Sequence, residues 1–398
     1  MKRLLLLAGE ESGVIYAEQI RRAALREWPD LEIRGYGDYG FAVGDLAVMG
    51  FLAVLRRIFF FMRVMRTMKR AIDEWRPDVV CTVDYPGMNL KLAAYAKSRG
   101  IRAVHVVCPQ VWAWKQGRIP KIEASLDRLC CFFPFEPALF RPGFAEFVGH
   151  PLAEDGRVER VERVDLKGED GRVERVEHVD LKGEDGRVER VERVELKGEE
   201  KDGGKLLAVL PGSRMGEIRH HMATLLESVA ELRRAIPGLR VSIPAANERA
   251  MAAIEGEIRR FGGASGVEVR LGGARELLAR ADAAVVASGT ATLEAALAGC
   301  PTVLVYKVDP VFAFVARRVI KGVRHIGLAN VVAEKAGVAC PMPELLQEDF
   351  TAGAVTAHLK SWLTDSAANA AARRDLAATT ALLGSGDDSI ERIVRNLV

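Results

Sequence analysis

The sequence predicts an α/β protein of two doubly wound, Rossmann-like domains followed by closing C-terminal helices. Its 398 residues are 49% hydrophobic and 28% charged, which is enough chain for two cores and excludes a disordered or collagenous protein. Short apolar runs alternate with longer segments of helical periodicity, as in successive β-α-β units. This alternation stops at a polar tandem repeat and then starts again, so we expect two such domains.

The first half contains four candidate strands and three candidate helices. Each strand is a run of Leu or β-branched residues that is apolar on both faces, which is typical of a parallel sheet covered by helices on both sides. Apolar residues recur at helical spacing between these runs. The expected strands are residues 4–8, 78–83, 103–108 and 128–133, and the expected helices are residues 15–28, 52–75 and 90–98.

The second half repeats the pattern and indicates the domain boundaries. We expect a first domain over residues 1–150, an insertion or linker over 151–203, a second domain over 204–350 and closing helices over 351–398. The strands expected in the second domain are residues 206–211, 240–244, 267–271, 283–288 and 302–307.

Residues 154–198 are three tandem 15-residue units, the first of which reads EDGRVERVERVDLKG. They hold 26 charged residues with a net charge of −4, so the rest of the chain carries +7 although the whole chain carries +3. So short and polar an array cannot build its own core, and we interpret it as a solvated insertion, with a spacer or partner-binding role as the alternative. The basic remainder suits an anionic partner such as a nucleotide, a phosphorylated substrate or an anionic lipid surface.

Several kinds of segment and site are not expected. The apolar run from Leu4 to Ala8 is too short for a signal peptide, and no window offers about 18 uninterrupted apolar residues for a membrane span. The histidine pair His220-His221 has no carboxylate or cysteine at ligand spacing, so we expect no metal site and no cofactor. The six cysteines form no CxxC pair and indicate buried free thiols in a reducing cytoplasm. They are Cys81, Cys108, Cys130, Cys131, Cys300 and Cys340.

Two loops of the first half carry polar groups where strands end, which is where open α/β sheets bind ligands. The first strand runs into GEESG (residues 9–13), where glycines and a helix N-terminus suit an anion or a polar oxygen. The strand at 78–83 ends at Asp84, a position suited to general-base chemistry, and Asn89 opens the next helix. A helix N-cap is the alternative interpretation of Asp84.

A third loop, residues 108–118 (CPQVWAWKQGR), carries two tryptophans beside lysine and arginine. Core packing would explain one tryptophan, but it would not explain a polar, basic neighbourhood around both. The composition therefore favours contact with a ligand.

Two loops of the second half suit a nucleotide. LPGSR (residues 210–214) brings backbone amides, a hydroxyl and a guanidinium to one helix N-terminus, as a diphosphate requires, although it lacks the Gly-Lys-Ser/Thr ending of a Walker loop. SGTATLE (residues 288–294) also joins a strand to a helix, and Glu294 can accept hydrogen bonds from two ribose hydroxyls. The absence of an Asp-x-Asp motif argues against neutralisation of a leaving diphosphate by metal. These features predict an enzyme that uses a nucleotide.

Residues 48–68 are mostly apolar but contain four arginines and no acid. Neither a buried helix nor a membrane span normally tolerates so many arginines. We interpret the segment as a basic amphipathic surface that lies on anionic lipid, with a partly buried helix and snorkelling arginines as the alternative. The residues expected to face the membrane are Phe51, Leu52, Leu55, Arg56, Arg57, Phe59, Phe60 and Arg63.

Taken together, these motifs resemble those of the lipid-A-disaccharide synthase family, inverting glycosyltransferases of lipopolysaccharide assembly. The sequence contains, in this order, GEESG, VDYPGMN, CPQVWAWKQGRIPKI, FPFEP, FVGHPL, LPGSRMGEI, SGTATLEAALAGCPTVLVYK and ELLQED. PxVWAW and LPGSR are the most specific of them. The resemblance covers residues 1–150 and about 204–350 closely, and it implies a GT-B fold with the active site in the cleft between two Rossmann-like domains.

The resemblance also implies a reaction and partners. UDP-2,3-diacylglucosamine would donate its sugar to 2,3-diacylglucosamine 1-phosphate (lipid X), which gives a β-1,6-linked disaccharide 1-phosphate and UDP without a metal ion. The enzyme would be cytoplasmic and bound peripherally to anionic phospholipid on the inner face of the inner membrane of a Gram-negative-type bacterium. No nucleic-acid partner is implied, and a homodimer is compatible with the resemblance.

The resemblance assigns roles to residues by their position in the motifs. Asp84 would be the general base that deprotonates the acceptor 6-hydroxyl, and Arg214 would stabilise the departing diphosphate. The UDP-sugar side would comprise Ser213, Arg214, Ser288, Gly289, Thr290, Glu294 and Asn330, and the acceptor side Glu10, Ser12, Gly13, Asn89, Gln110 and Trp112.

The chain departs from the family pattern mainly on the acceptor side. Val14 and Gly87 stand where the family usually has aspartate, and GYGDYG (residues 35–40) replaces a GGPxM segment. Ala329 stands where proline usually precedes Asn330. Two alternatives stay open: another UDP-sugar enzyme of GT-B shape, such as a different glycosyltransferase or a UDP-N-acetylglucosamine 2-epimerase, and a degenerate nucleotide-sugar-binding protein.

Overall fold

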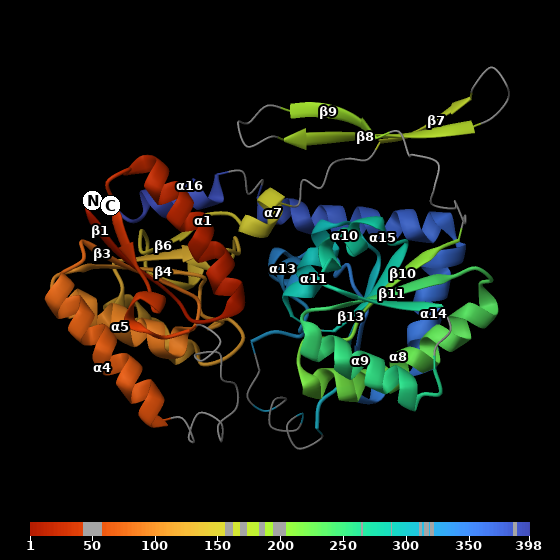
Figure 1. Ribbon diagram of the computed structural model, residues 1–398, viewed down its shortest axis with the longest axis horizontal. Helices are drawn as coiled ribbons and strands as arrows, with labels where there is room; N and C mark the ends of the chain where they lie inside the picture. Colours follow the sequence, from red (N-terminus) through yellow and green to blue (C-terminus); the bar gives the residue numbers. More distant parts are fainter. Residues whose placement is uncertain are drawn as a thin grey trace.

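The computed structural model describes residues 1–42, 58–155, 162–167, 173–182, 188–193, 204–263, 266–287, 289–309, 313, 318, 322–384 and 388–398. In these ranges the chain forms two six-stranded parallel sheets, each flanked by helices, and one small antiparallel sheet (Figure 1). The predicted α/β class with two doubly wound sheets is confirmed.

The first parallel sheet is built by the N-terminal part of the chain. Its strands are β1 (Arg3–Ala8), β2 (Glu32–Arg34), β3 (Val79–Val83), β4 (Arg102–Val106), β5 (Arg128–Cys131) and β6 (Ala145–Phe147), in the spatial order β2-β1-β3-β4-β5-β6. Its helices are α1 (Glu11–Glu27), α4 (Ile58–Trp75), α5 (Pro86–Ser98) and α6 (Ile119–Ser125). Leu4 and Leu5 point to opposite faces of β1, and both are fully buried because α1 covers one face while α4 and α5 cover the other.

The second parallel sheet has the same architecture. Its strands are β10 (Leu206–Leu210), β11 (Arg240–Ala245), β12 (Val267–Leu271), β13 (Ala283–Ala287), β14 (Thr302–Tyr306) and β15 (Glu344–Leu346), in the order β12-β11-β10-β13-β14-β15. Its helices are α8 (Met215–Ala235), α9 (Glu248–Arg260), α10 (Ala274–Arg280), α11 (Thr290–Leu297), α13 (Leu328–Ala336), α14 (Ala352–Thr364) and α15 (Ser366–Thr380). α8, α9 and α14 pack on one face of the sheet, while α10, α11 and α15 pack on the other.

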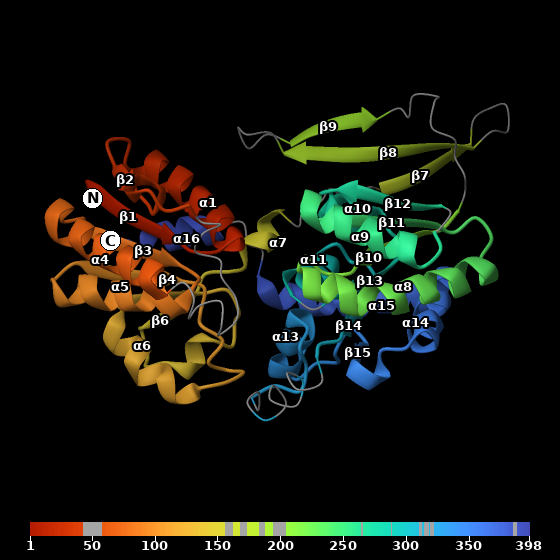
Figure 2. The same ribbon diagram turned by 60° about the horizontal axis from the view of Figure 1, so that its bottom comes forward.

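The last helix, α16 (Ser389–Arg395), leaves the second half and packs against α1 of the first half (Figure 1). Ile390 and Ile393 enter the apolar core beside β1, and Arg392 pairs with Glu146 at 3.3 Å. The short α7 (Pro151–Asp155) lies between the two halves (Figure 2). Short 3-10 helices occupy residues Gly37–Tyr39, Gln116–Arg118, Pro137–Leu139, Gln347–Asp349 and Ala381–Leu383.

The tandem repeats form a three-stranded antiparallel sheet that the sequence analysis did not predict. Its strands are β7 (Glu162–Lys167), β8 (Val173–Lys182) and β9 (Val188–Arg193), which pair Val164 with Val176 and Val179 with Val191 (Figures 1 and 2). Valine recurs every third residue in the repeat, whereas strand faces alternate every second residue. The repeat therefore lacks the two-residue period by which a half-buried strand is recognised in a sequence.

The segment expected to face a membrane is described only in part. Phe51, Leu52, Leu55, Arg56 and Arg57 lie outside the described residues. The remainder of the segment belongs to α4. Its buried side chains recur at the spacing of one helix face and are Val64, Met68, Ala71, Ile72 and Trp75. Among the described helices, none combines the length and apolar character needed to cross a bilayer.

Candidate active site

Asp84 lies at the carboxyl end of β3 in a strained stretch of backbone. Its φ is 50° and that of Tyr85 is 52°, which is the left-handed region that non-glycine residues rarely adopt. The Asp84 amide donates to the Val106 carbonyl at 3.0 Å, and the Asp84 Oδ1 accepts from the Tyr85 amide at 2.8 Å. The hydrogen bonds of the described residues leave Oδ2 unused, and burial raises the pKa of the carboxyl above its usual range. Such strain and desolvation are typical of a functional carboxylate.

The GEESG loop packs against Asp84. A side chain on Gly9 would collide with the Tyr85 ring, and Gly13 lies against the carbonyl of Val83. Burial raises the pKa of Glu10, the charge of Asp84 raises it further, and the charge of Arg214 lowers it. Glu10 is therefore close enough to both groups for their charges to act on it, although they come from different halves of the chain. The backbone of Ser12 lies in the first turn of α1, and its side chain is outside the described structure.

The LPGSR loop (residues 210–214), which we expect to bind a diphosphate, places Arg214 at the N-cap of α8. Gly212 has a φ of 107°, which lets the chain turn from β10 into the helix. The guanidinium of Arg214 pairs with Glu217 at 3.1 Å, and 58% of the Arg214 side chain is exposed. Ser213 is also exposed beside it. A hydroxyl and a cation thus stand at the amino end of a 21-residue helix, where its dipole favours negative charge.

His221 holds this loop in place, a role the sequence analysis missed. The imidazole is buried, its Nδ1 lies 2.8 Å from the Pro211 carbonyl, and its Nε2 accepts from the Lys307 amide at 2.9 Å. Burial lowers the pKa of this histidine, so the ring is neutral at physiological pH. The histidine pair is visible in the sequence, but its spacing gives no sign that His221 binds backbone groups of two other loops.

The SGTATLE motif (residues 288–294), the second motif expected to bind the nucleotide, leads into α11. Gly289 has a φ of 131°, Thr290 opens the helix with an exposed side chain, and Ser288 lies outside the described residues. Glu294 is half-buried one turn later. Burial raises its pKa, whereas the charge of Arg275 lowers it.

Two asparagines that the resemblance predicts to contact substrates instead form hydrogen bonds to backbone groups through their side-chain amides. Asn330 is fully buried, with Nδ2 donating to the Met342 carbonyl at 2.7 Å and Oδ1 accepting from the Met342 amide at 3.0 Å. Asn89 is also fully buried and donates to the Asp84 carbonyl at 2.8 Å. A direct contact between either amide and a substrate would require one of these bonds to break.

The tryptophan loop joins the two halves of the molecule. Trp112 is 4% exposed, and its Nε1 donates to Glu136 at 3.0 Å. Its ring packs in one apolar cluster with Val331 of the second half, and the neighbouring Ala113 carbonyl accepts from the Gly322 amide at 3.1 Å. Gln110 of the same loop is exposed. The loop therefore has two parts: Trp112 is buried at the contact between the two halves, and Gln110 is exposed.

Glu136 is a buried carboxyl whose titration we expect to affect stability. Burial raises its pKa to about 8, from an ordinary value of 4.5. Between these two pH values the folded protein keeps the proton and the unfolded chain releases it, so the free energy of unfolding falls as pH rises. Glu136→Gln removes this dependence, so we predict that the gap in the free energy of unfolding, wild type minus variant, falls steadily as pH rises through this window. Urea midpoints across the window measure it, with the exposed Glu27→Gln as control; a gap that stays constant with pH would contradict the prediction.

Among the described residues, one group of side chains has metal-ligand geometry. The ligand atoms of Cys108, Cys131 and Glu136 lie within 4.8 Å of one another, and all three residues are buried. Both Glu136 oxygens already accept hydrogen bonds, from Trp112 and from the Phe133 amide. A hydrogen bond with Cys131 and burial raise the pKa of the Cys108 thiol. Since both carboxyl oxygens already have partners inside the protein, we assign no metal to this group.

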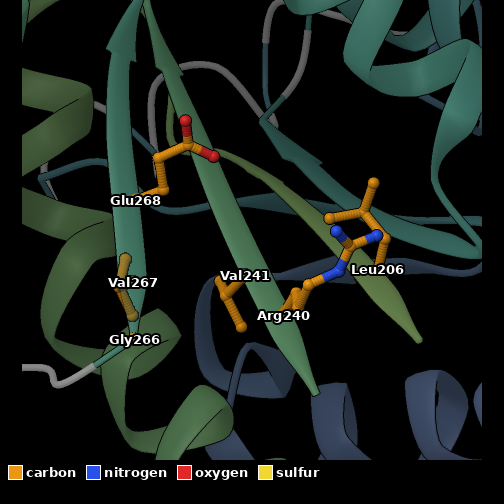
Figure 3. A pocket seen from close by; sticks show the side chains of 6 residues that line it. All are labelled: Leu206, Arg240, Val241, Gly266, Val267 and Glu268. Atoms are coloured by element: carbon orange, nitrogen blue, oxygen red, sulfur yellow. The ribbon is translucent and has the colours of Figure 1, made fainter. Parts of the chain in front are cut away.

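A surface hollow lies at the other end of the second sheet (Figure 3). Its walls come from the first residues of β10, β11 and β12, which are the amino ends of these strands. Since ligands of such sheets bind at the carboxyl ends, this hollow is not the candidate active site. The residues around it are Leu206, Arg240, Val241, Gly266, Val267 and Glu268.

The two Rossmann-like sheets form a GT-B fold, in which the loop of Asp84 and the loop of Arg214 both lie near Glu10. Solved structures with this fold include the Neisseria meningitidis UDP-GlcNAc 2-epimerase bound to UDP-GlcNAc, with a TM-score of 0.60 at 12% identity over 100% of this chain and 99% of that chain. The calicheamicin glycosyltransferase CalG4 matches over 100% of both chains, with a TM-score of 0.54 at 15% identity. Likenesses at this identity show the fold alone.

The particular family follows from the sequence comparisons. The family model described as lipid-A-disaccharide synthetase matches residues 4–170 and 185–390. The lipid-A-disaccharide synthase of Chromohalobacter salexigens is 34% identical over 395 residues, which covers 96% of this chain and 94% of that protein. The chain therefore belongs to the lipid-A-disaccharide synthase family, and its activity is that of a glycosyltransferase.

Proposed function

We propose that this enzyme transfers 2,3-diacylglucosamine from UDP-2,3-diacylglucosamine to the 6-hydroxyl of 2,3-diacylglucosamine 1-phosphate (lipid X). The products are the β-1,6-linked disaccharide 1-phosphate and UDP. One observation carries the assignment of roles: Glu10, in the loop that packs against Asp84, lies close enough to both Asp84 and Arg214 for their charges to shift its pKa. The candidate base, Asp84, and the candidate diphosphate-binding cation, Arg214, therefore both lie near Glu10.

The proposed mechanism is a single displacement. Asp84 takes the proton from the acceptor 6-hydroxyl through Oδ2, and the resulting oxygen attacks the anomeric carbon of the donor as the bond to the diphosphate breaks. The anomeric configuration inverts because attack and departure occur on opposite faces. Burial supports the base role of Asp84, since a raised pKa makes its carboxylate a stronger proton acceptor.

The leaving UDP gains negative charge as the bond breaks. Arg214, the Ser213 hydroxyl and the amide groups at the start of α8 are suited to stabilise that charge without a metal ion. We assign the remaining contacts with UDP to the loop of Gly289 and Thr290 and the ribose hydroxyls to Glu294. Asn330 would act by fixing the start of α13, because its amide is occupied inside the protein.

Incubation of the enzyme with the donor alone and with both substrates tests this proposal. UDP release that depends on lipid X, together with formation of disaccharide, supports glycosyl transfer. Equal UDP release without lipid X would indicate hydrolysis, and conversion of the donor sugar at C2 would indicate epimerisation; either result would contradict the proposal.

We also propose that α4 lies on the membrane that supplies the acylated substrates. Phe59 is 81% exposed and Met62 is 51% exposed, and the neighbouring Arg63 is exposed as well. Apolar side chains beside cations suit the boundary between acyl chains and anionic headgroups. By this proposal the enzyme binds peripherally to the membrane, on the cytoplasmic face that the family resemblance implies. The homodimer compatible with the family resemblance stays a prediction, which light scattering of the purified protein can test.

A double substitution tests the membrane contact. Phe59→Ser with Met62→Ser should weaken binding to phosphatidylglycerol vesicles by about tenfold or more, because each buried side chain contributes roughly 1.5–3 kcal/mol. Vesicle sedimentation measures the change, and Phe261→Ser is the matched control because Phe261 is an exposed aromatic residue of the second half. Unchanged sedimentation of the double variant would exclude this face of α4 as the contact.

A further inference from the structure

The GYGDYG segment at residues 35–40 departs from the family pattern, and the proposed reaction leaves it unexplained. It follows β2 and packs against α4 and α5, in the apolar cluster that covers one face of the first sheet. Tyr36 is 3% exposed in this cluster. Its hydroxyl donates to the Oδ1 of Asn89 at 2.7 Å, across 53 residues of sequence.

Asn89 connects this hydroxyl to the backbone of the candidate base. Its Nδ2 lies 2.8 Å from the carbonyl oxygen of Asp84 and 3.1 Å from that of Val83. It also lies 3.2 Å from the carbonyl of Leu7, a strand residue two positions before the GEESG loop. One buried amide thus ties together the ends of β1 and β3, where the two acceptor-side loops begin.

The backbone that Asn89 holds needs such support. Asp84 and Tyr85 are consecutive non-glycine residues with φ near 50°, and a left-handed conformation persists at these residue types only where surrounding contacts impose it. The bond from Asn89 to the Asp84 carbonyl is one of those contacts, and the bond from the Asp84 amide to Val106 is another.

The orientation of the Asn89 amide decides whether this support exists. Turned by half a rotation, the amide would direct its oxygen at backbone carbonyls, which cannot donate. With Nδ2 facing the carbonyls, the buried Oδ1 needs a donor, and among the described residues the Tyr36 hydroxyl supplies it. We propose that Tyr36 is a positioning residue for glycosyl transfer, which acts through Asn89 on the geometry of Asp84. This inference rests on the proposed role of Asp84 as the base.

Tyr36→Phe removes the hydroxyl and keeps the ring in the cluster. We expect kcat to fall about 10- to 30-fold, because displacement of a catalytic group by a fraction of an ångström slows the chemical step. KM for both substrates should change less than about twofold. Tyr39→Phe is the matched control, since Tyr39 packs on the same cluster and contributes none of the bonds that Asn89 makes among the described residues. Unfolding midpoints ensure that each kcat refers to folded enzyme.

A double-mutant cycle with Asp84→Asn separates positioning of the base from a general structural role. If Tyr36 acts through the base, Tyr36→Phe lowers kcat in the Asp84 enzyme and changes it less than about twofold in the Asp84→Asn enzyme. The same factor in both backgrounds, or wild-type kcat for Tyr36→Phe, would overturn the inference. Full activity of Asp84→Asn alone would instead refute the base assignment, so the two failures are distinguishable.

Discussion

Asp84→Asn should lower kcat by about 10² to 10⁴-fold, because the variant keeps the shape of the loop but cannot take the proton of the acceptor hydroxyl. Asparagine Oδ1 can still accept from the Tyr85 amide, so the turn after β3 is preserved. UDP binding should be nearly unchanged, since the loops that we propose to bind the nucleotide belong to the second half of the chain. Kinetics with both acylated substrates and calorimetric titration of UDP measure the two quantities.

The stability and pH dependence of this variant give further checks. Burial disfavours the ionised form of Asp84 in the folded protein, so Asp84→Asn should unfold no more easily than wild type at neutral pH. The activity of the wild type should fall as pH is lowered through the raised pKa of this base, at a higher pH than for an ordinary aspartate. Asp30→Asn, in the exposed turn after α1, is the control and should leave turnover unchanged. Normal turnover of Asp84→Asn would mean that another group removes the proton.

Arg214→Gln should lower kcat by about 10² to 10³-fold, because a cation directed at a developing diphosphate charge acts mainly in the transition state. Glutamine can donate one hydrogen bond but carries no charge, so part of the contact remains. Binding of UDP should weaken less than turnover, since the amide groups of α8 and the loop of Gly289 still hold phosphate.

Arg234→Gln is the matched control for this substitution. Arg234 lies in the last turn of the same helix, is exposed, and bonds only within its own helix among the described contacts. We expect wild-type kcat for it. A fall of equal size in both variants would indicate damage to α8, and normal turnover of Arg214→Gln would remove Arg214 from the mechanism.

The inner strands were predictable from sequence because parallel strands between two layers of helices are apolar on both faces. β1, β3, β4, β5 and the four inner strands of the second sheet all follow this rule. The edge strands β2, β6 and β15 were missed because each has three residues, too few to show a period. The sheet of the repeats was missed because valine at every third residue matches neither strand nor helix periodicity.

The site was predictable to the level of the loop but not of the side chain. Strand ends and glycines indicate which loops reach a ligand, and the family motifs add roles to residues within them. Sequence does not show the direction of a side chain, so the motifs predict acceptor contacts for Asn89 and Trp112 and cannot show that both are buried and hydrogen bonded inside the protein. The roles of His221 and Tyr36 are not predictable from sequence. His221 binds the backbone carbonyl of Pro211, and Tyr36 binds the side-chain amide of Asn89, which lies 53 residues away.

The configuration and linkage of the product test the central claim most directly. The enzyme is supplied with UDP-2,3-diacylglucosamine and lipid X, and the isolated product is analysed by mass spectrometry and by NMR of the anomeric proton. We predict one β-1,6-linked disaccharide 1-phosphate for each UDP released, and loss of this product in the Asp84→Asn enzyme. An α-linked product, free 2,3-diacylglucosamine or a sugar inverted at C2 would contradict a single displacement by the acceptor hydroxyl.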